Sequence, residues 1–413
     1  MHGVEDIALE KQIEQALHFD VSSRLHDVGE YYFSKKLRQI EDLNKAGKNV
    51  INLGIGSPDL PPHPDVIETL RTESEKPNTH AYQNYKGNII LRQAIADWYR
   101  KWYAVEINAE TEVLPLIGSK EGIMHICMTY VDADTLVLIP DPGYPTYKSA
   151  AQIAGATIKS YSLTKANNWF PDFAELKEII AGHRTVNSQS RVIMFVNYPQ
   201  MPTGKLPDKT LFENIVQFAI QHHILICHDN PYSFILNNEP MSMLSVPAAK
   251  QVVIELNSLS KSHNMAGWRV GMMIADKQRI DDVVRFKSNM DSGMFLPVQM
   301  AAAKALQIGE NWFKELNNIY SKRREKVFDI LDNLKCSYDK KQAGLFVWAA
   351  IPAVYKDGYA LSDHILNDAS VFITPGGIFG TAGDKYIRIS LCSTVQKLDE
   401  ALARISSIND QTS

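Results

Sequence analysis

Apolar residues in this chain fall into two alternating patterns. Short continuous runs within residues 135–147, 191–204 and 223–232 are bounded by polar, proline or glycine residues, as buried strands are. Segments with apolar residues three and four apart precede or separate these runs, for example residues 91–99, 118–130 and 208–222. Strands that alternate with helices predict an α/β fold, with a mostly parallel sheet between two layers of helices.

The two ends of the chain show a different arrangement. Phe33, Leu37, Ile40 and Leu43 form one helical stripe that should end near Gly47. Residues 345–350, 371–374 and 386–391 form short strand-like runs, and residues 287–299 should lead into one long helix reaching about residue 331. We therefore predict an N-terminal arm and part of a small domain in residues 1–48, a large domain in 49–299, and the rest of the small domain in 300–413.

Composition narrows the class of protein. The 413 residues are 45% apolar and 22% charged, with a net charge of −4, which is ordinary for a soluble globular protein. This charge gives no basic surface for nucleic acid or an anionic membrane. No leader pattern and no apolar run of membrane-spanning length is present in the sequence, so we expect a cytoplasmic protein. Four scattered cysteines show no metal-ligand spacing.

The candidate chemistry centres on residues 257–271. Lys261 lies between two apolar runs, with serines at 258, 260 and 262 and Arg269 eight residues later. A lysine shielded by apolar neighbours can be kept partly neutral, and a neutral amine can attack a carbonyl. Gly118-Ser-Lys-Glu-Gly122 follows a strand and opens a helix, which suits a phosphate. Asp229 ends a buried strand and should therefore face a cation.

Several motifs together resemble the class I aminotransferases, enzymes of fold type I that use pyridoxal phosphate. The motifs are the lysine segment, Leu-Gly-Ile-Gly-Ser-Pro-Asp-Leu-Pro at 53–61, Gly-Ser-Lys-Glu-Gly at 118–122, His-Asp-Asn-Pro-Tyr-Ser at 228–233 and Asp-Ser-Gly at 291–293. The resemblance covers nearly the whole chain and is strongest for the branch with LL-diaminopimelate and alanine or aspartate aminotransferases.

The resemblance implies a role for each matching residue. Lys261 would form the Schiff base, and Arg269 and Ser258 would hold the phosphate together with Gly118, Ser119 and Lys120. Tyr144 would stack on the pyridine ring, Asp229 would hold its protonated nitrogen, and Tyr232 would donate to its phenolic oxygen. Tyr82 would reach the partner subunit's phosphate, which implies a homodimer with shared sites. Gly56 and Arg388 would bind the substrate carboxylate, Arg388 through a two-pronged contact.

One position departs from the family. Most relatives carry an asparagine directly before Pro-Thr-Gly, where its amide donates to the phenolic oxygen, and this chain carries Met201. Asn197, four residues earlier, is not the same position. His228 is interpreted as a packed residue or one that lies behind the site.

The resemblance implies a ping-pong transfer of an amino group from an L-amino acid to a 2-oxo acid, with glutamate and 2-oxoglutarate as the expected second pair. Lys261 would serve as both anchor and general base. Two alternatives stay open from the sequence: a carbon–sulfur β-lyase on the same fold, and a cofactor-binding regulator. We expect no metal, and small molecules as the ligands.

Overall fold

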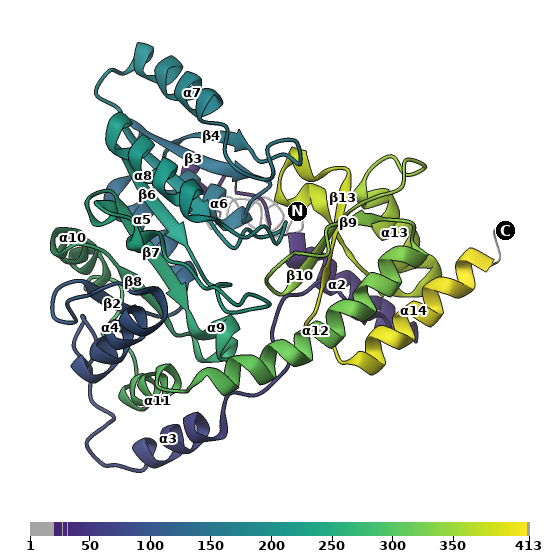
Figure 1. Cartoon of the computed structure of the whole chain (residues 1–413), viewed down its shortest axis with the longest axis horizontal. Coiled ribbons are helices and arrows are strands. Elements are labelled where there is room, and N and C mark those ends of the chain that lie inside the picture. The colour runs from purple at the N-terminus through teal and green to yellow at the C-terminus, as the bar shows by residue number, and fades with distance from the viewer. Residues whose placement is uncertain (1–19, 27, 31, 411–413) are drawn as a thin grey trace, which may run out of the picture.

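The computed structural model describes residues 20–26, 28–30 and 32–410. Its larger sheet has the strand order β2-β8-β7-β6-β5-β3-β4. Neighbouring strands are parallel except at β8, which is antiparallel to both β2 and β7. This sheet and its helices form the left part of Figure 1. Its strands are β2 Val113–Leu116, β3 Thr135–Asp141, β4 Thr157–Ser162, β5 Arg191–Asn197, β6 Ile224–Asp229, β7 Val253–Ser258 and β8 Gly271–Ile274.

Helices cover both faces of the larger sheet, because its strand residues point alternately to the two sides. One apolar cluster joins one face to α4, α7, α8 and α11, and another joins the opposite face to α5, α6 and α10. The helices of this part are α3 Pro64–Ser74, α4 Ile89–Tyr103, α5 Ser119–Tyr130, α6 Pro145–Ile153, α7 Phe173–Val186, α8 Lys209–His222, α9 Leu259–Ser262, α10 Lys277–Lys287 and α11 Leu296–Leu306.

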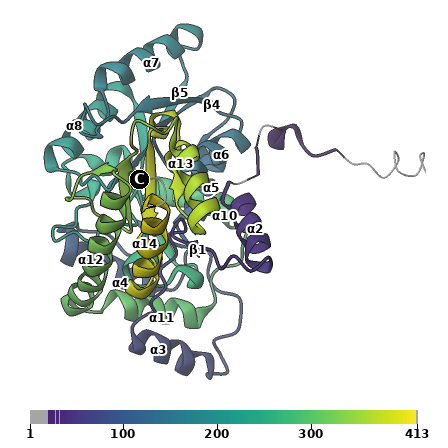
Figure 2. The ribbon, with the colours of Figure 1, turned by 90° about the vertical axis from the view of Figure 1, so that its right-hand side faces the viewer.

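A second, smaller sheet lies beside the first and is antiparallel, in the order β12-β13-β10-β9. The short parallel pair β1–β11 adds the segment that follows α2. Figure 2 shows α2, α13 and α14 gathered around this part of the molecule. Its elements are α2 Tyr32–Lys45, β1 Ile51–Asn52, α12 Glu310–Asn333, β9 Ser337–Tyr338, β10 Phe346–Ala350, α13 Gly358–Ala369, β11 Val371–Phe372, β12 Thr374–Pro375, β13 Tyr386–Ser390 and α14 Val395–Asp410.

The predicted α/β class is confirmed, and the prediction of one long helix after residue 299 is wrong. Lys261 lies on the one-turn helix α9 rather than in a loop. The expected single helix after residue 299 is broken between α11 and α12, where Gly309 starts the second helix. Asp172 and Glu175 have the spacing of a capping box at the start of α7, but the Glu175 carboxylate accepts from the backbone and hydroxyl of Ser162 instead.

The domain boundaries at 48/49 and 299/300 remain a proposal. Residue 300 falls inside α11, which packs on α3 and α4 of the larger part, whereas α12 packs on α14. We therefore place the second boundary between these two helices. Within the described part of the chain, no helix is long and apolar enough to cross a membrane.

Candidate active site

A cavity of about 480 Å³ opens between the two parts of the molecule, at the carboxyl ends of the parallel strands. Ligands bind at this edge in open α/β sheets. Ten of the residues predicted from the sequence line it, namely Gly56, Ser119, Lys120, Tyr144, Asp229, Tyr232, Ser258, Lys261, Arg269 and Arg388. Gly118 lies directly behind Arg269. Tyr82 does not line the cavity, because its side chain is 91% exposed on the outer surface.

Lys261 projects into this cavity from α9. The hydroxyl of Ser258 begins that helix by accepting from the backbone of Ser260, so the end of β7 turns directly into the lysine segment. Nζ of Lys261 donates to the carbonyl oxygen of Gly56 at 2.7 Å. Burial lowers the pKa of Lys261, and the positive charges of Arg388 and Arg269 lower it further, against an opposing effect of Cys392. These effects favour the neutral amine that covalent chemistry requires.

Arg269 and the start of α5 form an anion-binding corner. Gly118 has a φ of +87°, and a Cβ there would lie 2.0 Å from Nη2 of Arg269. Glycine thus permits the guanidinium to lie against the backbone at the helix start. The Arg269 Nη1 donates to the carbonyl of Ala266 at 2.7 Å, which fixes the side chain. Backbone N–H groups at the start of α5 add the partial positive charge of a helix N-terminus.

Asp229 is the last residue of β6, and its two carboxylate oxygens have different surroundings. Its Oδ2 accepts from the hydroxyl of Tyr147 at 2.8 Å. Its Oδ1 is buried and has no hydrogen-bond partner among the described residues. Burial raises the pKa of Asp229 to about 6, against the opposing effects of the Tyr147 hydrogen bond and the charge of His228. The site therefore has an open acceptor for a cationic ring nitrogen.

Sequence reasoning left Tyr147 without a role. A signal was present, because Tyr147 lies three residues after Tyr144 across the start of a helix, where the two side chains share a face. Their rings meet edge to face at 5.6 Å, and Tyr147 stacks on Phe195 at 4.8 Å.

Arg388 lies on β13 at the other wall of the cavity. Its Nη2 donates to the carbonyl of Gly54 at 2.8 Å, and its Nη1 lies 3.3 Å from the sulfur of Met201. The guanidinium carbon lies 3.7 Å from the ring centroid of Phe346 and 4.6 Å from that of Phe379. These contacts hold the charged plane at a fixed angle.

The loop that carries Gly54 and Gly56 is tied to both parts of the molecule. Asp59 accepts from Arg323 of α12 through both carboxylate oxygens, at 2.6 and 2.8 Å. Arg323 is 4% exposed and also donates to the carbonyl of Leu391. On the other side, Asn264 donates to the carbonyl of Pro61 at 3.2 Å. The loop is thereby held across the mouth of the cavity.

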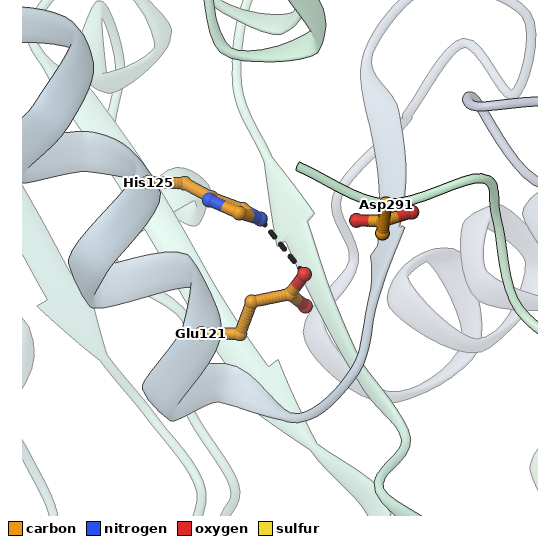
Figure 3. A group of neighbouring side chains, drawn as sticks. All are labelled: Glu121, His125 and Asp291. Carbon is orange, nitrogen blue, oxygen red and sulfur yellow. Dashed lines mark hydrogen bonds and ion pairs between the residues drawn. The ribbon is translucent and has the colours of Figure 1, made fainter. Parts of the chain in front are cut away.

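A partly buried polar cluster lies at the first turn of α5 (Figure 3). Glu121 accepts from the backbone of Ile117 and pairs with Nε2 of His125 at 2.8 Å. Possible ligand atoms of Glu121, His125 and Asp291 lie within 4.8 Å of one another. The ammonium of Lys287, 1% exposed, donates to both oxygens of Asp291. Because that ammonium supplies a positive charge, we interpret the cluster as an ion network that joins loop 288–295 to α5.

Comparisons with known proteins identify the family of the chain. The family model described as aminotransferase class I and II matches residues 48–405. The chain belongs to this family. Two relatives are named LL-diaminopimelate aminotransferase. The one from Dehalococcoides mccartyi is 36% identical over 95% of this chain and 99% of its own length. The one from Oleidesulfovibrio alaskensis is 38% identical over 94% and 99%.

Solved structures show the same fold. Substrate-bound BacF from Bacillus subtilis has a TM-score of 0.88 and 32% identity, covering 95% of this chain and 98% of that one. An aspartate aminotransferase mutant from Thermus thermophilus has a TM-score of 0.86 at 20% identity and supports the fold alone.

As an aminotransferase of this family, the protein is a transaminase that uses pyridoxal phosphate. The cavity residues fit that cofactor. Asp229 offers the open carboxylate oxygen that a pyridinium nitrogen requires, and Lys261 offers the amine. The corner at Gly118 and Arg269 offers a place for the phosphate. Met201 is 6% exposed and lines the cavity, so the predicted departure from the family lies within the site.

Proposed function

We propose that this aminotransferase moves the amino group of an L-amino acid to a 2-oxo acid with the residues predicted from its sequence. The convergence of Lys261, Asp229, Arg269 and Arg388 on one cavity is the observation that carries the proposal. When bound, pyridoxal phosphate supplies an electron sink for the substrate's Cα. Asp229 keeps the ring nitrogen protonated, and Tyr232 and Tyr144 hold the ring. Arg388 orients the substrate carboxylate, and the freed amine of Lys261 moves the proton at Cα.

For the substrates, we propose glutamate and 2-oxoglutarate as one pair and LL-diaminopimelate as the first candidate for the other. The names of the relatives support LL-diaminopimelate. Lys120, whose backbone is expected to contact the phosphate, also lines the cavity and carries a positive charge on its side chain. All three molecules carry a second carboxylate, which a second cation would attract.

We further propose a cytoplasmic homodimer. An exposed apolar patch supports this assembly, and it includes Tyr82, the residue expected to act on the partner's site. The patch comprises Tyr82, Tyr85, Ile89, Ile90, Met290 and Phe295. Its two segments lie side by side, because the Phe295 ring is 5.7 Å from His80 and a Cβ on Gly293 would lie 3.0 Å from the Asn84 carbonyl. Patches of this kind mark protein interfaces.

The test is an absorbance spectrum of the purified holoenzyme, recorded before and after single L-amino acids are added without any oxo acid. We expect the visible band to convert to the shorter-wavelength band of the amino form of the cofactor. Glutamate and LL-diaminopimelate should convert it most effectively. Pyruvate and ammonia accumulating without that conversion would instead identify a β-lyase. A protein that shows no visible band with added pyridoxal phosphate would overturn the assignment of Lys261.

A further inference from the structure

His228 and Asp229 are consecutive on β6 and therefore point to opposite faces of the sheet. Asp229 points toward α6 and the cavity, where it meets Tyr147. His228 points to the other face, where its partner in register on the parallel strand β7 is Glu255. Both His228 and Glu255 are 0% exposed. A titratable pair thus lies directly behind the residue proposed to hold the ring nitrogen.

The hydrogen bonds of His228 place a proton on one of its two ring nitrogens. Nε2 lies 3.2 Å from the carbonyl oxygen of Tyr198, and a carbonyl can only accept, so Nε2 carries a proton. Nδ1 lies 2.8 Å from Oε2 of Glu255. The protonation of Nδ1 therefore depends on whether this carboxylate is ionised.

Glu255 is surrounded by donors. The hydroxyl of Tyr99 donates to Oε1 at 2.8 Å, and the hydroxyl of Ser242 lies 2.8 Å from Oε2. The backbone of Met243 donates to Oε2 at 3.1 Å. Three donors of this kind stabilise an ionised carboxylate. If Glu255 is ionised, it can only accept from Nδ1, and His228 then carries both protons and a positive charge.

We propose that His228 and Glu255 form a buried ion pair whose imidazolium keeps the Asp229 carboxylate ionised from the opposite face of the sheet. The inference rests on the proposed role of Asp229. His228 is then a positioning residue, because it acts through Asp229 and does not touch the cofactor. Burying an ion pair costs free energy, because both charges lose their hydration. Hydrogen-bond donors that satisfy the carboxylate offset this cost.

The phenols and the thiol near His228 and Asp229 do not supply a positive charge. The phenols of Tyr99, Tyr103 and Tyr198 have pKa values raised by burial and stay neutral. On the cavity side, Tyr147, Cys227 and Tyr232 also have pKa values raised by burial. His228 is the neighbouring charge that lowers the pKa of Asp229.

The test measures the proton on Asp229 in the apoprotein by infrared difference spectroscopy. The carboxylic acid band that disappears in Asp229→Asn identifies Asp229, and its pH midpoint should be about 6 in the wild type. His228→Gln and Glu255→Gln should each raise this midpoint, because each removes the imidazolium. The matched control is His125→Gln, which breaks the His–Glu pair of α5 and should leave the midpoint in place.

An unchanged midpoint in both single variants would overturn the proposal, since a merely structural pair would affect stability and not this titration. If one single variant does not fold, the double variant His228→Gln/Glu255→Gln removes both charges together and should still raise the midpoint. A failure of the proposed function would give a different result. Asp229→Asn would then bind pyridoxal phosphate as tightly as the wild type, while the midpoints would still shift as predicted.

Discussion

At the scale of single residues, Met201 is the clearest departure from the family pattern. Its backbone donates to Asn197 at 2.7 Å, and its sulfur lies 3.3 Å from Nη1 of Arg388. A thioether offers no hydrogen-bond donor to a phenolic oxygen. In this protein Tyr232 is then the predicted donor to that oxygen.

We predict that Met201→Asn lowers the pH at which the visible band of the holoenzyme changes. A second donor to the phenolic oxygen favours the deprotonated form of the cofactor–lysine linkage, by up to about one pH unit. A spectral pH titration of the two proteins measures the shift. Met201→Leu has no donor and should titrate like the wild type; a shift of equal size in Met201→Leu would contradict the explanation.

Asp229 gives a second prediction, for the apoprotein. Its pKa is about 6 when folded and 3.8 as a free side chain. Because the folded value is the higher one, the carboxyl favours folding below pH 3.8, and this contribution is lost as the pH rises through 6. Asp229→Asn should therefore stabilise the apoprotein above pH 6, by on the order of 3 kcal/mol, while weakening cofactor binding. Denaturant unfolding at pH 5 and pH 8 tests this, and equal stabilities of the two apoproteins at pH 8 would refute it.

Most individual site residues could be predicted because they follow strand ends in recognisable motifs. Ten of them line one cavity. The role of Tyr147 and the pairing of His228 with Glu255 could not be predicted, because both depend on strand register and helix packing between segments far apart in the chain. Sequence motifs identify residues that face the ligand, whereas these contacts support those residues from other segments of the chain.

At the scale of elements, the turn from β2 into α5 depends on Gly118. Its φ of +87° and the nearness of Arg269 are two separate requirements for glycine. Gly118→Ala should strain the backbone by on the order of 1–3 kcal/mol, because φ +87° with ψ 154° is essentially restricted to glycine, and should also displace the guanidinium. We expect the affinity for pyridoxal phosphate to fall at least roughly ten-fold, which reconstitution of the apoprotein would measure.

Gly155→Ala is the matched control for this variant. Gly155 has a φ of +90°, but nothing lies within 4 Å of its added Cβ. It carries the backbone strain without the clash, so it should lose stability and keep its cofactor affinity. Equal losses of affinity in the two variants would show that strain alone explains the effect.

Elements were predicted well where periodicity was long, as in α4 and α8, and less well where side chains decide the local path. The lysine segment contains small polar residues typical of a loop, but the cap from Ser258 turns it into α9. Glu175 has capping-box spacing, yet Ser162 on the neighbouring strand binds it instead. Such competition between local and tertiary partners is not visible in a single sequence.

At the scale of the whole molecule, the Asp59–Arg323 pair holds the loop over the cavity to α12. Lysine cannot reproduce the two-pronged contact, so Arg323→Lys should loosen the loop and release Gly54 from Arg388. We expect KM for both substrates to rise roughly ten-fold with a smaller change in kcat. Arg71→Lys, at an exposed pair on α3, is the control and should keep the wild-type KM. A fall in kcat alone would contradict a positioning role.

The proposed dimer gives the last prediction. Ile90 and Phe295 are 48% and 44% exposed and lie in the apolar patch of α4 and loop 288–295. A charge at either position would be buried unpaired in a symmetric interface, so Ile90→Asp and Phe295→Asp should reduce the mass in solution to that of one chain. Light scattering measures this mass. Val186→Asp, at an 89% exposed position at the end of α7, should keep the wild-type mass.

Because Tyr82 is expected to complete the partner's site, the monomeric variants should also lose cofactor affinity. A fully active monomer would exclude shared sites.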